Sequence, residues 1–343
     1  MDEDLLLRDE RRRARPEAAC NDVEASEAGS IAVAAKLDAR SLQVPLRRGA
    51  RRPNRTGASL PEIRRLLSRT WQFLLAQRTD DANELIDHIE LQIDGLPTLA
   101  ARRLTEATHL LRAVSLAFDD HWLAAYTMAQ VHMDRNGAPK GAARTLYKIG
   151  LWKLMRQQAF QAASSQWPGN GCSRSEATAA GFDLSIEAAF AIDQLRLTTA
   201  KRLATHACGM FQASQASRTD AAEGLILLPL SLIALVHYEQ GDLHDAERLI
   251  GDRLPLVDAE SSIESALRCY LVLARIARHR MHYDLAGILL SRGEALGERR
   301  GWPRLALACM AEKVSCLLEI GRREEARLCL ERCDRYIEAS ARV

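Results

Sequence analysis

The sequence has few aromatic residues, no excess of one sign of charge and no apolar run of membrane-spanning length. Phe, Trp and Tyr make up 5% of its 343 residues, and 47 basic side chains stand against 45 acidic ones. This balance gives no general attraction to nucleic acid or to an anionic membrane. The longest apolar run, 225–236, is twelve residues long, whereas a spanning helix needs about twenty. We therefore expect no membrane partner.

Motifs for catalysis and for cofactor binding are also missing. Neither the phosphate-binding G-x-x-x-x-G-K-[ST] nor the zinc-binding H-E-x-x-H occurs. His279 and His282 lie three residues apart, but no third ligand follows at a metal-site spacing. We predict that the chain is not an enzyme and binds no cofactor or metal. An enzyme whose site has no recognisable pattern stays open as an alternative.

The eight cysteines are scattered, and no signal-peptide pattern precedes them. This favours a reducing, cytoplasmic location in which thiols act as small apolar core residues. A zinc-binding or redox-responsive cluster is the alternative for four of them, although they lack C-x-x-C spacing. These four are Cys309, Cys316, Cys329 and Cys333.

Residues 1–58 differ in composition from the rest of the chain. They contain blocks of charge, such as RRGARRPNR at 47–55, and few large apolar side chains, a composition typical of disorder. We expect 1–58 to be a largely disordered segment and 59–343 to form the folded domain. The arginines of 47–55 would also suit an arm that contacts nucleic-acid phosphates, but no recognition helix accompanies them.

From Leu60 onward, apolar residues recur at the three- and four-residue spacing of amphipathic helices. Runs of alternating β-branched residues, which would indicate strands, are absent. A six-residue pattern ending in alanine returns every forty residues, at 241–246, 281–286 and 321–326. Looser matches place the alanine at Ala82, Ala125, Ala163 and Ala200.

A helical hairpin explains this pattern. Its turn needs a small or flexible residue, and five positions later an alanine lets the second helix approach the first closely. Helix pairs with a period near forty predict an all-α fold, a right-handed α-solenoid of about seven antiparallel pairs similar to tetratricopeptide repeats. The repeat-packing residues are then Gly241, Ala246, Ala286, Gly321 and Ala326.

Three segments of the last third carry a resemblance to a known family: YEQGDLHDAERL at 238–249, ALRCYLVLARIA at 266–277 and RGWPRLALACMAEKVSCLLEIGR at 300–322. Over about 225–335 the chain resembles the helical-repeat sensor region of the large ATP-dependent LuxR-type (MalT-like) transcriptional regulators. The resemblance implies a sensor and signal-transfer arm. The family's ATPase and helix-turn-helix modules have no counterpart in this sequence. We therefore expect a truncated or degenerate member or a fragment, which would contact DNA only through a module absent from this chain.

The concave face of such a solenoid is the candidate site for a protein partner or a small-molecule inducer. In the tetratricopeptide register, eight side chains of the first helices face it: Trp152, Tyr238, Glu239, Arg268, Arg275, Arg278, His279 and Glu319. The three arginines would either receive a carboxylate, a phosphate or an acidic segment, or form salt bridges between repeats. A stand-alone adaptor that holds a peptide or helix in the groove is the alternative function.

Overall fold

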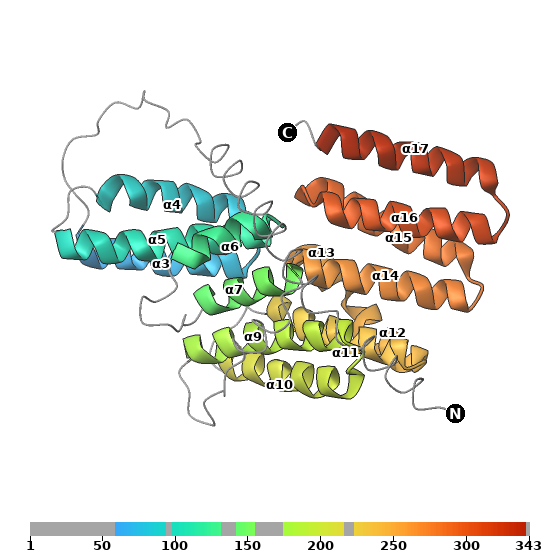
Figure 1. Ribbon diagram of the computed structural model, residues 1–343, viewed down its shortest axis with the longest axis horizontal. Coiled ribbons are helices and arrows are strands. Elements are labelled where there is room, and N and C mark those ends of the chain that lie inside the picture. The colour runs from blue at the N-terminus through green and yellow to red at the C-terminus, as the bar shows by residue number, and fades with distance from the viewer. Residues whose placement is uncertain (1–58, 94–97, 132–141, 155–173, 216–222, 341–343) are drawn as a thin grey trace, which may run out of the picture. The chain divides into compact units, whose positions relative to one another are not determined.

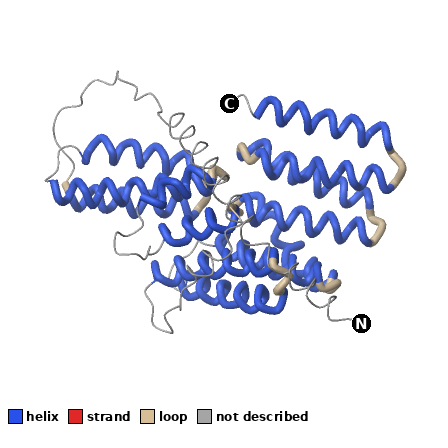
Figure 2. The backbone as a smooth tube through the Cα atoms, viewed as in Figure 1, coloured by secondary structure: helices blue, strands red, loops and turns tan. Residues whose placement is uncertain are grey.

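The structure is a computed structural model of the chain. Every regular element that it describes is helical, with no strand among the described residues, so the predicted all-α fold is confirmed (Figure 2). None of the described helices has an apolar stretch long enough to cross a bilayer. The segment 1–58, expected to be disordered, lies outside the described residues, as does Ala163. The described residues belong to the compact unit 57–343 and are 59–93, 98–131, 142–154, 174–215 and 223–340.

The helices form antiparallel pairs, each with a first and a second helix (Figure 1). The pairs described in full are α3 (Leu60–Leu75) with α4 (Thr79–Ile93), α5 (Thr98–Phe118) with α6 (Trp122–Val131), α9 (Arg174–Asp193) with α10 (Leu197–Gln215), α11 (Leu227–Glu239) with α12 (Leu243–Ile250), α14 (Ile263–His279) with α15 (Tyr283–Arg300), and α16 (Pro303–Glu319) with α17 (Arg323–Ser340).

The remaining elements are one further first helix and three short connecting helices. The helix α7 (Ala142–Lys153) is a further first helix, and residues 155–173 after it lie outside the described residues. The short helix η1 (Glu223–Ile226) precedes α11, while η2 (Gly251–Arg253) and α13 (Leu254–Glu260) follow α12.

Successive pairs stack through their first helices. The helix α3 packs on α5, α5 on α7, α7 on α9, α9 on α11, α11 on α14 and α14 on α16. Second helices also pack on the next first helix, as α4 does on α5 and α15 does on α16. Because each pair buries its apolar face against its neighbours, this is a helical-repeat fold. The predicted stack of about seven helix pairs is confirmed.

The described hairpin turns share one backbone conformation, in which a residue with positive φ lies five positions before a buried alanine. After α11, for example, Gly241 has a φ of 84°. The N–H of Asp242 then donates to the carbonyl of His237 at 2.8 Å, which satisfies the helix end. The six combinations are Gln77 with Ala82, Asp120 with Ala125, Leu195 with Ala200, Gly241 with Ala246, Met281 with Ala286, and Gly321 with Ala326.

Three of the turns differ from the sequence-based expectation, because their left-handed residue is neither small nor especially flexible. The pattern predicts a small or flexible residue at each reversal, as at Gly241 and Met281. Gln77, Asp120 and Leu195 nevertheless adopt the same left-handed conformation, with φ values of 58°, 66° and 58°. This conformation costs a side chain about 1–2 kcal/mol. The capping hydrogen bonds and the helix–helix contact therefore impose the turn.

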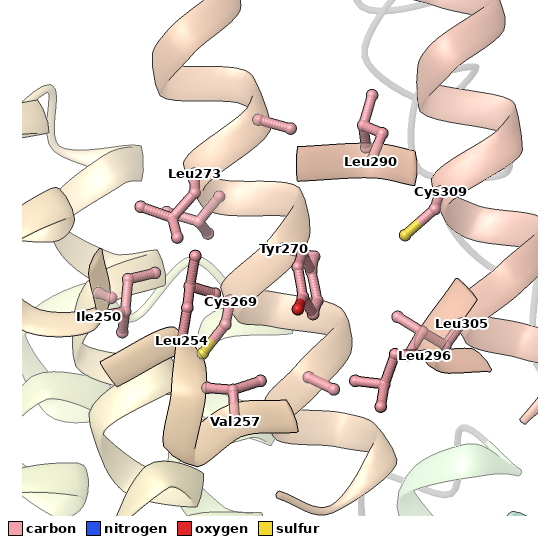
Figure 3. Packing of buried hydrophobic residues seen from close by; sticks show 14 of the residues in the cluster. Ile250, Leu254, Val257, Cys269, Tyr270, Leu273, Leu290, Leu296, Leu305 and Cys309 are labelled. Atoms are coloured by element: carbon pink, nitrogen blue, oxygen red, sulfur yellow. The ribbon is translucent and has the colours of Figure 1, made fainter. Parts of the chain in front are cut away.

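A core cluster spanning α11 to α16 surrounds the fully buried side chain of Tyr270 (Figure 3). The helix α15 comes close to this cluster because two of its buried residues are glycines. A Cβ at Gly293 would lie 2.6 Å from Cys309 Sγ, and one at Gly297 would lie 2.7 Å from the backbone nitrogen of Ala306. Both distances are too short for a real contact, so the packing of α15 against α16 requires glycine at these positions.

We expect Gly297→Ala to lower the free energy of unfolding by about 1–3 kcal/mol, because the added methyl group collides with backbone. Gly287 on the same helix is the matched control, since a Cβ there meets no atom within 4 Å. Gly287→Ala should raise the free energy of unfolding by about 0.5–1 kcal/mol through helix propensity. Urea unfolding measures both values, and effects of equal sign would contradict the close packing of α15 on α16.

The left-handed turns give a second pair of variants. Leu195 is 84% exposed at a φ of 58°, so its side chain adds strain and little packing. We expect Leu195→Gly to raise the free energy of unfolding by about 0.5–1 kcal/mol. The relief of backbone strain stabilises the variant, and the greater conformational freedom of glycine in the unfolded chain offsets part of that gain. Gly241→Ala should lower it by about 1 kcal/mol. Thermal unfolding tests the pair, and a loss of stability in Leu195→Gly would refute the assigned strain.

Candidate functional site

The eight side chains predicted to line the groove all lie on first helices. Trp152 is on α7, and Glu319 ends α16. The structure therefore distributes them along the row of first helices that contact one another, and their role in binding stays a prediction. Tyr238 and Glu239 end α11, and α14 carries Arg268, Arg275, Arg278 and His279.

Arg275 and Arg278 both bind Glu312 of α16. Arg275 Nη2 lies 2.9 Å and Arg278 Nη1 lies 2.6 Å from the Glu312 carboxylate, whose side chain is 10% exposed. Arg278 Nε also lies 3.5 Å from Glu319. The hydrogen bond from Arg275 to Glu312 raises the pKa of the Arg275 guanidinium. Of the two interpretations of these arginines, the structure shows salt bridges between repeats, and their charges are balanced by those of Glu312 and Glu319.

The other predicted groove residues have different surroundings. The indole N–H of Trp152 donates a hydrogen bond to Asp193, and Lys153 Nζ lies 4.6 Å from the centre of the Trp152 ring. Tyr238 is partly buried and packs against the core cluster, whereas His279 is exposed. The structure thus brings Arg275 and Arg278 together through Glu312, with Glu319 beside Arg278. Trp152 is held by a separate set of partners.

Glu264, in the first turn of α14, binds three cations, and the sequence analysis does not single it out. Its carboxylate lies 2.6 Å from Arg304 Nη2, 3.2 Å from Lys153 Nζ and 3.0 Å from Arg268 Nη2. Arg304 Nε also lies 2.9 Å from Asp120, in the turn between α5 and α6. These five residues, which we call the Glu264 cluster, tie α7, α14 and α16 to that turn.

The Glu264 cluster holds its central carboxylate ionised. Burial by itself raises the pKa of Glu264, but the charges of Arg268, Arg304 and Lys153 together outweigh it and lower the pKa to about 2. Lys153 is 111 positions from Glu264, and Arg304 is 40 positions away. No local sequence pattern reports contacts over such separations, which is why the sequence analysis does not predict the cluster.

A second group of charges joins α7 to α9. Lys148 Nζ lies 2.9 Å from Asp183 Oδ2, and both side chains are fully buried. Arg144 Nε approaches the same carboxylate at 3.2 Å, and Glu187 also binds Lys148. Burial raises the pKa of Asp183, and the charge of Lys148 opposes that rise. Charges buried in this way are costly to leave unpaired, so the group fixes which faces of α7 and α9 meet.

A groove of about 740 Å³, the α15–α17 groove, lies between these two second helices and is lined also by α16. Its apolar residues include Ile288 and Leu328, which are 65% and 52% exposed. Gly287 lines it as well, and a Cβ there would meet no atom within 4 Å. Local sequence patterns do not predict this groove, because its width depends on how successive pairs stack. Its charged residues are Asp284, Lys313, Arg322, Glu325 and Arg332.

The cysteines near these helices are buried thiols. Burial raises the pKa of Cys269 and Cys309 to about 12, and it also raises the pKa of Cys329 and Cys333. A thiol with a raised pKa is a poor nucleophile and metal ligand at neutral pH. Within the described ranges, no group of three or more His, Cys, Asp and Glu side chains is placed to hold a metal ion. Both observations favour a packing role for these cysteines.

Comparison with known proteins identifies the fold and not a family. No protein-family model and no curated protein matches the chain. Among solved structures, the chain is similar to that of a Rap protein complexed with competence and sporulation factor, with a TM-score of 0.55. The similarity covers 81% of this chain and 77% of that chain at 12% sequence identity. The fold is tetratricopeptide-like.

We expect Glu264→Gln to lower the free energy of unfolding by about 2–3 kcal/mol at pH 7, because it removes the anion shared by three cations. The folded pKa of about 2 lies below the unfolded value of about 4.3. The contribution is therefore fully present above about pH 5 and is lost as the pH falls towards 2. The difference between the wild type and Glu264→Gln should shrink over that interval.

Urea unfolding at several pH values measures this difference. Glu106→Gln is the control, because Glu106 forms an ion pair with Arg102 in which both side chains are more than half exposed. Its effect should stay below about 0.5 kcal/mol at every pH. An equally small and pH-independent effect of Glu264→Gln would contradict the assigned role of the Glu264 cluster.

Proposed function

We propose that this chain is a non-catalytic, protein-binding helical repeat and that the α15–α17 groove receives the apolar face of a partner helix. The groove carries the proposal: it has a volume of about 740 Å³ and is lined by side chains of α15, α16 and α17. Amphipathic helices bind proteins by laying their apolar face into grooves of this kind.

The composition of the groove supports a helix as its occupant. Ile288 on α15 and Leu328 on α17 are more than half exposed in the free chain. Covering them would remove apolar surface from water and stabilise a complex. Charged residues of both signs border these side chains, among them the Arg322–Glu325 ion pair. A polar rim around an apolar centre is the usual anatomy of a protein–protein interface.

The row of first helices is less open to an acidic partner. A ligand carboxylate at Arg275 or Arg278 would compete with Glu312, which already binds both. We therefore place the principal binding site in the α15–α17 groove. The predicted groove residues on the first helices remain the expected site only in the second candidate function.

That second candidate is the sensor arm of an ATP-dependent LuxR-type regulator. The three segments that carry the resemblance form the end of α11 with most of α12, most of α14, and α16. The fold shared with a Rap protein complexed with competence and sporulation factor supports partner binding but does not separate the two candidates. A sugar or phosphorylated metabolite that raises the Tm of the purified chain, and no longer does so in Arg275→Ala, would favour the sensor arm.

The adaptor proposal is tested with helical peptides. Amphipathic helical peptides selected from a displayed library against the purified chain should bind in the α15–α17 groove. Gly287→Trp fills the groove and should raise the Kd of a selected peptide at least tenfold. Gly287→Ala is the matched control and should leave it unchanged. Fluorescence anisotropy with a labelled peptide measures both, after thermal unfolding has shown that the variants are folded. Equal affinity for all three chains would place the binding site elsewhere.

A further inference from the structure

We propose that the outer face of the last helix pair binds a second copy of this chain, giving a dimer with two-fold symmetry. We call this surface the end face. It consists of six apolar residues on two adjacent helices: Leu307, Ala311, Val314 and Leu318 on α16, and Leu330 and Ile337 on α17.

The α16 members of the end face form one stripe, and its α17 members are about half exposed. The four on α16 recur at intervals of four, three and four, which places them in one stripe along a helix. Leu307 and Val314 pack against the core cluster between α16 and α17, so the stripe on α16 runs beside α17. On α17, Leu330 and Ile337 lie seven positions apart and are 53% and 51% exposed. Leu318 is 54% exposed.

No described helix covers the end face. In the earlier pairs, each second helix packs on its own first helix and on the next one, as α10 does on α9 and α11, and α15 on α14 and α16. Within the described part of the chain, α17 packs extensively on α16 alone. Among the described helices, the last pair thus leaves exposed the kind of apolar face that the earlier pairs bury against a neighbour. Exposed apolar patches are typical of surfaces that bind another molecule.

The charges of α17 indicate that this molecule is a second copy, packed antiparallel. Arg323 and Arg327 precede Leu330 on the helix, and Asp334 and Glu338 follow it. Successive members of this series lie three or four residues apart, so the four charged side chains share one flank of α17. A two-fold axis between positions 330 and 331 would bring Arg323 next to Glu338 of the second copy and Arg327 next to its Asp334. A parallel arrangement would oppose like charges instead.

The present contacts of three of these side chains are consistent with this pairing. Neither Arg323 nor Asp334 forms an ion pair with another described residue. Arg327 pairs with Glu324 and Glu331 of its own helix, but its side chain is 59% exposed. Such exposed pairs are weak and exchange readily. Because a two-fold interface is closed, the association stops at the dimer.

The end face is separate from the α15–α17 groove. The groove is bordered by Leu328 and Arg332 on α17, whereas Leu330 and Ile337 occupy a different flank of the same helix. Dimer formation therefore leaves the groove open, and this inference does not rest on the proposed function. Gly287→Trp, which fills the groove, should leave the mass of the assembly unchanged.

Light scattering coupled to size exclusion tests the dimer on the full-length chain between about 1 and 100 μM. We expect a mass rising with concentration to twice the chain mass of 38.1 kDa. Leu330→Arg combined with Leu318→Arg should give the monomer at every concentration. Leu195→Arg is the control, since it changes an 84% exposed leucine in the turn before α10, and it should remain dimeric. Circular dichroism verifies that each variant is folded.

A charge-reversal experiment tests the antiparallel arrangement. One chain carries Arg323→Glu and Arg327→Glu, and a second carries Asp334→Arg and Glu338→Arg. A homodimer of either variant would place like charges opposite one another across the two-fold axis. Each variant by itself should therefore be mostly monomeric. Mixed, the two should form a heterodimer at least tenfold tighter than either homodimer. A wild type that stays monomeric at 100 μM, or a dimer unaffected by Leu318→Arg with Leu330→Arg, would overturn the proposal. If the two charge-reversed variants do not associate when mixed, the antiparallel geometry of the proposed dimer is wrong.

Discussion

The contact between two helices at a buried alanine, five positions after a left-handed turn residue, is the constraint on which this structure depends. A helix pair of this size cannot bury its apolar face alone, so its two helices must approach closely and then stack on further pairs. Gly241 with Ala246 satisfies the constraint without strain, and Leu195 with Ala200 satisfies it despite a left-handed leucine. The helix contact therefore outweighs the backbone preference of the turn residue.

Stacking places charged side chains of different pairs against one another, and these charges are largely used within the chain. The Glu264 cluster links first helices that are far apart in sequence, and Glu312 holds Arg275 and Arg278. Because a partly buried ion pair is costly to break on one side only, the row of first helices behaves as a fixed framework. The surfaces left for partners are then formed chiefly by second helices and by the end face.

The α15–α17 groove and the end face follow from the same geometry, on two flanks of α17. On one flank, α17 faces α15 across α16, and the gap between them exposes Ile288 and Leu328. On the other, α17 occupies the position at which earlier second helices meet the next pair, and there Leu330 and Ile337 stay exposed. One helix thus supports two separate proposals: partner binding in the groove, and self-association at the end face.

The sequence by itself determined the features that depend on nearby residues. The alanine at 246, 286 and 326 and the turn before it are local, so the period and the helix pairs could be predicted. The candidate site could be predicted only as a set of first-helix residues. Arg275 and Arg278 look like a basic patch in the sequence, because their shared partner Glu312 lies 37 and 34 positions away. Tertiary structure alone decided those pairings, the Glu264 cluster and the α15–α17 groove, since each depends on how distant pairs stack.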